Sequence, residues 1–219
     1  MKLSTLNRTI IACRQCPRLV EWREETARVK RKAYQNEEYW GKPVPGFGDE
    51  NARVLVVGLA PGAHGSNRTG RQFTGDASGN FLFPALHRAG FASQPNATSR
   101  DDGLTLRGMY ISAAARCAPP DNKPSPAELN ACQSYLEREI QILRPKVIVC
   151  LGKIAFDRLL KIFDMRGLKF SHGATFNIHP VTLLCSYHPS QQNTLTGKLT
   201  VEMFDDIWKK AKTLLNETP

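Results

Sequence analysis

The chain has 219 residues, 41% of them hydrophobic, and a formal net charge of +10. This length and composition suit a single globular domain over residues 1–219, and they exclude a disordered or membrane-spanning chain, because no apolar run is long enough. The N-terminus lacks the apolar segment of a signal peptide, so we expect a cytoplasmic protein. The basic charge favours an anionic partner, nucleic acid first, over a protein that is merely basic and soluble.

Helices and strands alternate along most of the chain. Helical patterns at 3–12 and 17–32 come before the first strand. Apolar, β-rich segments predict strands at 53–59, 109–115, 146–152 and 181–187, and helical patterns lie at 79–90, 126–143, 153–163 and 199–215. Such continuous apolar runs are typical of strands buried on both faces of a parallel sheet. We therefore predict an α/β fold, a three-layer α/β/α sandwich with a central, mostly parallel four-stranded sheet.

One helix start is defined by its residues. Ser125 is a predicted N-cap, Pro126 occupies the first helical position, and Glu128 the third. Together they form a capping box with a proline at N1. The helix that begins here places a cysteine in its second turn.

The six cysteines fall into two groups. Cys150 and Cys185 sit inside apolar strand segments, where a cysteine usually behaves as a small core residue. The other group lies around loops and helix starts, and consists of Cys13, Cys16, Cys117 and Cys132. Four thiolates so distributed can bind zinc or an iron–sulfur cluster, and their spacing alone does not distinguish the two.

A glycine-rich segment follows the first predicted strand and reads GLAPGAHGSNRTGRQFTGDASGN (58–80). Ligands of parallel sheets bind beyond the carboxyl ends of the strands, where this loop must lie. It matches neither the Walker A pattern nor G-x-G-x-x-G, so composition alone indicates a generic anion-binding loop. Asp76 could equally be an N-cap of the next helix, and Phe73 could be a core residue.

The last predicted strand leads into SYHPSQQNTLTG (186–197). His188 should project from the same edge of the sheet as the glycine-rich loop. A hydrogen-bonded surface or core histidine is an equally good interpretation of this residue by itself. The convergence of two strand ends on one cleft favours the functional interpretation.

Taken together, the glycine-rich motif, the SYHPSQQNT motif and the four loop cysteines resemble a type B (family 5) uracil-DNA glycosylase, the iron–sulfur branch of the uracil-DNA glycosylase superfamily. The resemblance covers nearly the whole chain. It implies a prokaryotic, nucleoid-associated DNA-repair enzyme with an α/β/α fold. It also implies a [4Fe–4S] cluster whose ligands are Cys13, Cys16, Cys117 and Cys132. We expect the cluster to have a structural function, and redox sensing is the alternative.

The resemblance also assigns roles in hydrolysis of the N-glycosidic bond of a flipped base. Phe73 stacks on the base, and His188 donates a hydrogen bond to the base oxygen on which negative charge develops. Asp76 positions water or stabilises the cationic sugar, and Asn122 is a second polar candidate. No motif offers a lysine nucleophile, so we expect a monofunctional enzyme that leaves an abasic site. The base-binding wall is expected to include Gly58, Ala60, Gly62 and Ala113.

Two positions depart from related families. Leu59 and Ala60 stand where other uracil-DNA glycosylases place a polar, water-activating residue. Ala113 stands where they place the asparagine that reads the uracil edge. Loss of paired hydrogen bonds should weaken discrimination between bases, so we predict excision of uracil and of deaminated purines such as hypoxanthine and xanthine.

DNA contacts are expected mainly to phosphates, with steep salt dependence. The expected substrate is double-stranded DNA with deaminated bases, and single-stranded DNA remains an alternative. We expect a monomer, and no feature indicates a sliding-clamp partner. The basic stretch 27–35 either extends the DNA footprint or is a solvated helix face. The expected DNA-binding residues are Arg68, Arg71, Ser190, Gln191, Gln192 and Asn193.

Three other functions are alternatives to the glycosylase. A non-catalytic iron–sulfur DNA-binding module would have the same fold but a truncated or apolar pocket, whereas Asp76, Asn122 and His188 are all present. An electron-transfer protein would be expected to show a second cofactor motif, and a zinc nuclease would need a set of carboxylate and histidine ligands that the sequence does not offer. The glycosylase is the preferred hypothesis.

Overall fold

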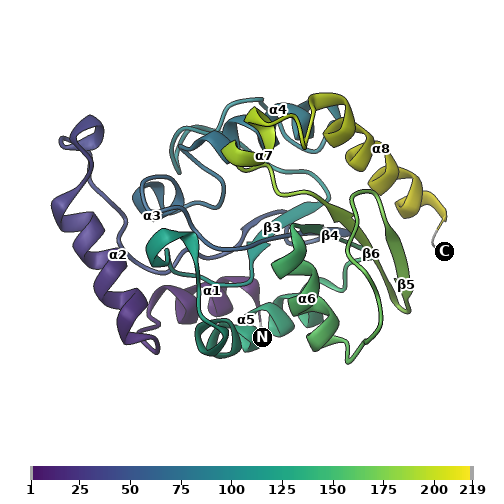
Figure 1. Cartoon of the computed structure of the whole chain (residues 1–219), viewed down its shortest axis with the longest axis horizontal. Helices are drawn as coiled ribbons and strands as arrows, with labels where there is room; N and C mark the ends of the chain where they lie inside the picture. The colour runs from purple at the N-terminus through teal and green to yellow at the C-terminus, as the bar shows by residue number, and fades with distance from the viewer. Residues whose placement is uncertain (1, 218–219) are drawn as a thin grey trace.

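The computed structural model describes residues 2–217 and contains the predicted three layers (Figure 1). Four parallel strands form the centre of the sheet: β2 (Val54–Gly58), β3 (Met109–Ala113), β4 (Val147–Leu151) and β6 (Val181–Ser186). Every residue of these strands is buried except one in β6, as expected for a sheet covered on both faces. The predicted strand positions are confirmed.

The predicted strand count of four is wrong, because the sheet formed within residues 2–217 has six strands in the order β1-β3-β2-β4-β6-β5. The additional strands β1 (Phe47–Gly48) and β5 (Thr175–Ile178) lie at the two edges and pair antiparallel with β3 and β6. Strand β1 has only two residues, and β5 alternates between exposed and half-buried positions. Neither has the continuous apolar run by which the central strands were predicted.

Helices cover both faces of the sheet (Figure 1). One layer contains α1 (Leu3–Ile11), α5 (Pro126–Leu143) and α6 (Lys153–Ile162). The other contains α4 (Ala77–Arg88) and α8 (Val201–Glu217). Successive β2 residues alternate between two separate cores: Val54 and Val56 pack toward α4 and α8, whereas Leu55 and Val57 pack toward α5 and α6. The helix α2 (Pro17–Val29) follows α1 at one end of the molecule.

Four short helical segments were not predicted: the 3₁₀ helices η1 (Lys32–Tyr34) and η2 (Pro120–Asn122), and the α-helices α3 (Ser66–Thr69) and α7 (Gln191–Leu195). Each is too short to show a 3.6-residue apolar period. Three of them lie within predicted loops. The fourth, η1, begins at the last residue of the helix predicted over 17–32, which in the structure ends at Val29. Among residues 2–217, no helix combines the length and apolarity needed to cross a bilayer.

The predicted start of α5 is confirmed. The Ser125 side chain accepts from the Glu128 backbone N–H at 3.2 Å, and the Glu128 carboxylate accepts from the Ser125 N–H at 2.7 Å. Further along, the Glu139 carboxylate accepts from Ser112 at 2.6 Å and from Arg116 at 2.5 Å. This buried set ties α5 to β3 and to the loop that follows β3.

Candidate active site

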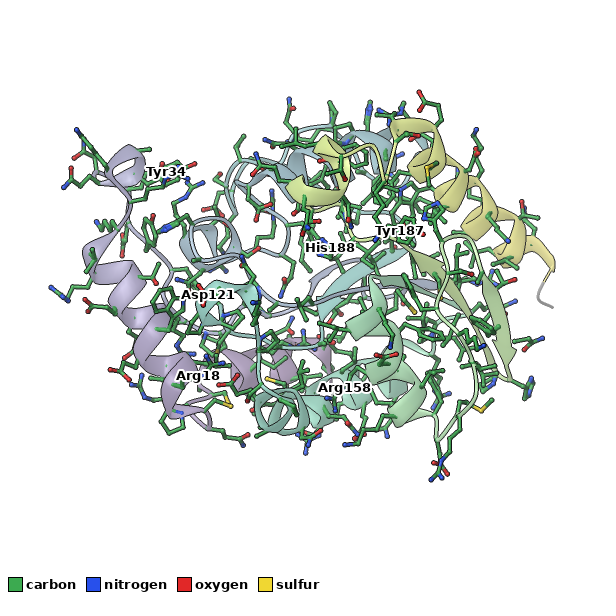
Figure 2. The ribbon with its side chains drawn as sticks, in the orientation of Figure 1. Arg18, Tyr34, Asp121, Arg158, Tyr187 and His188 are labelled. Atoms are coloured by element: carbon green, nitrogen blue, oxygen red, sulfur yellow. The ribbon has the colours of Figure 1, made fainter. Side chains whose placement is uncertain are left out.

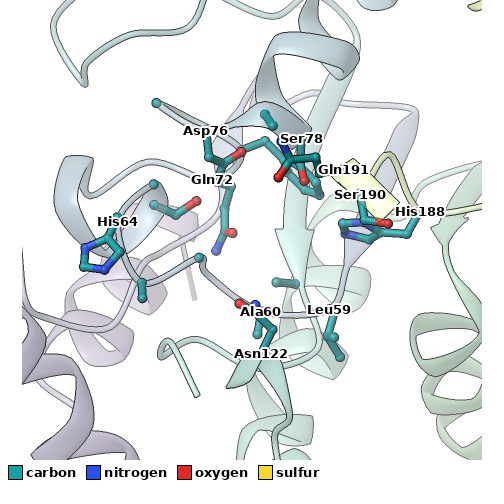
Figure 3. A pocket seen from close by; sticks show the side chains of 18 of the residues that line it. Leu59, Ala60, His64, Gln72, Asp76, Ser78, Asn122, His188, Ser190 and Gln191 are labelled. Carbon is teal, nitrogen blue, oxygen red and sulfur yellow. The ribbon is translucent and has the colours of Figure 1, made fainter. Parts of the chain in front are cut away.

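A pocket of about 830 Å³ opens where β2, β3 and β6 end (Figure 3). Its position at the carboxyl edge of the sheet is the one predicted for a ligand site. Segments from five parts of the chain contribute to its wall. The lining residues are Arg31, Tyr34, Leu59, Ala60, Gly62, Ala63, His64, Gly65, Ser66, Gln72, Phe73, Gly75, Asp76, Ala77, Ser78, Ala113, Asp121, Asn122, His188, Ser190, Gln191 and Gln192.

Asp76 is both an N-cap and a pocket residue, so the two interpretations of this position are compatible. One carboxylate oxygen accepts from the Gly79 N–H at 3.0 Å at the start of α4. The other oxygen faces Gly62 and Gly65, and a Cβ on Gly65 would lie 2.0 Å from it. Burial raises the pKa of Asp76, opposed by the N–H groups of Gly79 and Ser78 and by the charge of Arg68. The carboxylate is thus held firmly in a site that disfavours its charge.

His188 follows β6 and borders the same pocket (Figure 3). Burial lowers the pKa of its imidazole to about 4. The ring is therefore neutral at pH 7 and can donate one N–H without adding a charge. Its centroid lies 5.8 Å from that of the Phe73 ring, with 31° between the planes.

Phe73 is 7% exposed and belongs to the core, yet it also borders the pocket. Its backbone has φ 52°, in the left-handed region that a non-glycine residue rarely adopts. Two glycines leave room for this residue. A Cβ on Gly58 would lie 2.7 Å from the Phe73 ring, and one on Gly79 would lie 1.8 Å from its carbonyl oxygen. The surrounding loop therefore fixes the ring at the edge of the cavity.

The base-binding wall expected from the motifs comes together in the structure. Gly62, Ala60 and Ala113 all line the pocket, so small side chains occupy the ends of β2 and β3. Gly58 lies behind Phe73 and is not itself a lining residue. Asn122 ends η2, is exposed, and approaches the pocket beside Ala60 (Figure 3).

The residues after His188 are of two kinds: some form hydrogen bonds within the loop, and others are exposed at the pocket rim. Ser190 caps α7 by accepting from the Asn193 backbone N–H at 3.4 Å, and the Asn193 amide donates to the His188 carbonyl at 2.9 Å. Gln191 and Gln192 are exposed at the pocket rim. Asn193 therefore has an internal function in this loop, holding the backbone of the histidine.

Arg68 and Arg71 point into the protein, although the sequence suggests phosphate contacts for both. Arg68 is 8% exposed, pairs with Glu37, and stacks 3.9 Å from the centroid of the Tyr34 ring. Arg71 is 4% exposed and forms a bidentate pair with Asp102 at 2.8 and 2.6 Å. Both guanidinium groups bind side chains of neighbouring loops, and neither lies at the protein surface.

Sequence reasoning assigned no site role to several individual pocket residues. The basic stretch 27–35, for which an extension of the DNA footprint was one of two interpretations, reaches the pocket, where Arg31 and Tyr34 are lining residues. His64 lines the pocket next to it and shares a 3.0 Å hydrogen bond with Tyr39. The charge of this stretch was the available signal. Gln72 and Ser78 had no comparable signal, because a lone polar residue in a loop has no period or motif.

An exposed apolar side chain was also missed. Leu195 is 78% exposed at the end of α7, the short helix whose first residues form the pocket rim. A single exposed leucine is common on protein surfaces. Leu195 is distinguished by its place on the helix whose first residues border the pocket.

The four loop cysteines are brought close enough to influence one another electrostatically. Burial raises the pKa of Cys117 to about 12, and neighbouring thiols add to the effect. Arg23, itself 2% exposed, donates to the Cys117 sulfur at 3.1 Å and to the Cys13 carbonyl at 3.4 Å. The four thiols come from the α1–α2 connection, the loop after β3, and α5: Cys13, Cys16, Cys117 and Cys132.

Buried guanidinium groups surround these thiols. Arg158 lies in the layer of α5 and α6, away from His188 and the pocket (Figure 2), and donates to Asn130 and Gln133 at 2.8 Å each. Its burial lowers its pKa, and the charge of Cys132 opposes that effect. Three buried Nε–H groups in this region lack a hydrogen-bond partner among the described residues, those of Arg23, Arg116 and Arg158.

Within the described part of the chain, no group of three or more His, Cys, Asp or Glu side chains is arranged to hold a metal ion.

The remaining cysteines, Cys150 and Cys185, are 0% exposed and occupy paired positions on β4 and β6. Their prediction as core residues is confirmed.

Fold and site together define a three-layer α/β protein with a polar pocket at the carboxyl edge of its sheet, containing a carboxylate and a neutral imidazole. Residues 45–212 match the sequence profile of the uracil DNA glycosylase superfamily. A type-5 uracil-DNA glycosylase of Thermus thermophilus is 55% identical, over 94% of this chain and 95% of its own length. A type-5 uracil-DNA glycosylase of Pyrobaculum aerophilum is 46% identical, over 92% of this chain and 88% of its own length.

A type-4 uracil-DNA glycosylase of Archaeoglobus fulgidus is more distant, with 33% identity over 67% of this chain and 70% of its own length. The chain therefore belongs to the uracil-DNA glycosylase superfamily, and its similarity to the type-5 relatives confirms the family-5 resemblance drawn from the motifs.

Proposed function

We propose that this chain is a monofunctional DNA glycosylase that removes uracil and deaminated purines from DNA and leaves an abasic site. The observation that supports this best is the combination, in one pocket, of a carboxylate with a raised pKa and an imidazole with a lowered pKa. The names of the relatives, type-5 uracil-DNA glycosylase, support uracil as a substrate.

The chemistry follows from the charges that appear as the glycosidic bond breaks. The flipped base departs with negative charge while the sugar becomes cationic. Phe73 stacks on the base, and the neutral His188 donates a hydrogen bond to the base oxygen, where the interaction strengthens as charge develops. Asp76 faces the sugar side, where its carboxylate opposes the positive charge and accepts a proton from the attacking water.

The proposed substrate range rests on the small residues of the pocket wall. Neither Gly62 nor Ala113 projects a long side chain into the cavity of about 830 Å³. A purine such as hypoxanthine or xanthine needs more room than uracil, and the small residues of this wall leave space for the larger ring. Without a side chain at position 113 that forms paired hydrogen bonds, recognition depends on other polar groups of the pocket.

We propose that the rim of the pocket contacts DNA. Gln191 and Gln192 contact the backbone around the lesion, Arg31 meets a phosphate, and Leu195 occupies the space that the flipped base leaves. The net charge of +10 supports binding to a polyanion in a bacterial or archaeal cytoplasm.

The four loop cysteines are proposed ligands of a [4Fe–4S] cluster: Cys13, Cys16, Cys117 and Cys132. A cubane with four thiolates has a net negative charge, and buried arginines with unpartnered Nε–H groups surround these thiols. A cubane also spaces its thiolates more widely than a single ion does. When bound, the cluster would cross-link the α1–α2 connection to α5 and to the loop that leads to Asn122.

The test uses anaerobically purified protein and duplexes that contain uracil, hypoxanthine or only normal bases. Base release is measured as alkali-labile breaks, and duplex binding is measured in parallel. Breaks at uracil and hypoxanthine but not in the normal duplex are expected. Binding without base release from any duplex would exclude the enzyme and leave the non-catalytic binding module.

A further inference from the structure

Gln72 is a buried polar residue of the pocket for which neither motif assigns a function. Its side chain is 2% exposed, and it directly precedes Phe73 in the chain. Figure 3 shows the side chain extending into the space bordered by Asp76, Ala60 and Asn122. A buried amide is costly unless its hydrogen bonds are satisfied, so its partners indicate its function.

One end of the Gln72 amide is fixed by the backbone. Its Nε2 donates to the Val44 carbonyl at 3.2 Å. A carbonyl oxygen can only accept, so this contact determines which end of the amide is nitrogen and which is oxygen. Among residues 2–217, the only side-chain hydrogen bond of Gln72 is the one from Nε2, and Oε1 is not one of the fully buried side-chain atoms without a partner, so this oxygen is accessible from the pocket. The fixed orientation thus leaves a hydrogen-bond acceptor available to a ligand in the pocket.

The proposed substrates share a group that such an acceptor can read. Uracil has an N3–H between two carbonyl groups, and hypoxanthine and xanthine have an N1–H next to the C6 carbonyl. Cytosine and adenine, from which uracil and hypoxanthine arise, have an unprotonated ring nitrogen at these positions. That lone pair would face the lone pairs of Oε1 and leave both acceptors unsatisfied in a buried site.

We infer that Gln72 is a specificity-determining residue whose Oε1 accepts a hydrogen bond from the lactam N–H of the flipped base. This inference rests on the proposed function and names the base edge that its pocket reads. The contact is insensitive to ring size, because pyrimidine and purine lesions both present the N–H. It therefore reconciles a wide substrate range with rejection of cytosine and adenine. Thymine and guanine share the N–H and are not rejected by this contact.

The experiment compares wild type with Gln72→Met, which keeps the side-chain length and removes the acceptor, and with Gln72→Leu. The matched control is Gln94→Met, a half-buried glutamine outside the pocket lining. Single-turnover excision is measured on duplexes with uracil, hypoxanthine or 1-deazahypoxanthine, whose ring has a C–H in place of the N1–H. Thermal melting of each protein reports its folding.

Wild type is expected to excise hypoxanthine about 10- to 100-fold faster than its 1-deaza analogue, as expected for one buried hydrogen bond. Gln72→Met and Gln72→Leu are expected to slow uracil and hypoxanthine by a similar factor and to leave the analogue unchanged. A loss that is equal for hypoxanthine and its analogue would mean that Gln72 only supports the loop through Val44, and would overturn the inference.

The wild-type comparison remains decisive if neither variant folds. Equal wild-type rates on hypoxanthine and 1-deazahypoxanthine would exclude any acceptor for the N1–H and so overturn the inference. Failure of wild type on every damaged duplex would instead overturn the proposed function itself. The two failures are therefore distinguishable.

Discussion

The pocket and the cysteine region both contain buried polar groups, but they differ in what surrounds those groups. In the pocket, burial pushes Asp76 and His188 toward their neutral forms, raising one pKa and lowering the other. Around the cysteines, three cationic side chains are buried, those of Arg23, Arg116 and Arg158. The pocket thus suits charges that appear only during a reaction, whereas the cysteine region suits a permanent negative charge.

Removal of a proposed cluster ligand should have the largest effect. Cys117→Ala should lose iron and visible absorbance, and should lower the free energy of unfolding by more than about 4 kcal/mol, as expected for loss of a structural metal centre. Cys185→Ala is the matched control, a buried cysteine of β6 that should keep its iron and lose about 1 kcal/mol. Iron content and thermal melting measure both. Unchanged iron in Cys117→Ala would contradict the proposed ligand set.

Asp76→Asn should separate activity from stability. Single-turnover uracil release is expected to fall on the order of 10²- to 10⁴-fold, because the amide neither accepts a proton nor opposes the cationic sugar. The melting temperature should stay the same or rise, since burial disfavours the carboxylate charge and the amide oxygen can still accept from Gly79. Asp121→Asn, an exposed carboxyl at the pocket rim, is the control. An equal loss of uracil release in both variants would mean that any negative charge near the pocket has this effect, and not Asp76 in particular.

The pH dependence of wild-type activity follows from the same residue. Uracil release should increase as the pH rises through the pKa of Asp76, which burial raises above its ordinary value. The midpoint of the rise measures that pKa directly. A midpoint at or below the ordinary value of an aspartate would show that the pocket does not disfavour the charged form.

His188→Asn should slow uracil release on the order of 10²- to 10³-fold by removing one donor to the departing base. It should also change the pH dependence of stability. The folded pKa of about 4 lies below the unfolded value, so wild type should lose up to about 3 kcal/mol as the pH falls from about 6.5 to 4, and nothing above that range. Denaturant melts at several pH values test this, with exposed His87→Asn as the control. An equally steep loss in His188→Asn would contradict the assignment.

Leu195→Ala should have the smallest effect. Because the side chain is 78% exposed, stability should change by less than about 0.5 kcal/mol. Uracil release should slow about 10-fold if the leucine fills the space left by the flipped base, in line with loss of one apolar contact. Val201→Ala, an exposed apolar residue outside the pocket lining, should leave the rate unchanged. A normal rate for Leu195→Ala would remove this residue from the proposed DNA contact.

Local patterns in the sequence were sufficient for most of the fold. The apolar runs of β2, β3, β4 and β6 and the capping box at Ser125 are signals that lie within a few consecutive residues. The convergence of the glycine-rich loop and His188 was also predictable, because parallel strands place their carboxyl ends at one edge. These features depend on backbone periodicity and hydrogen bonding between near neighbours.

Tertiary structure decided which polar side chains reach the pocket. Arg68 and Arg71 belong to the same motif as Asp76, yet their partners Glu37 and Asp102 lie about thirty residues away and turn them inward. Gln72 acquires a directed acceptor only because the distant Val44 carbonyl binds its other end. The sequence by itself determined the strands, the helix caps and the edge of the sheet where the site lies. The orientation of each charged or amide group depended on long-range contacts, because burial and hydrogen-bond partners come from segments that no local pattern connects.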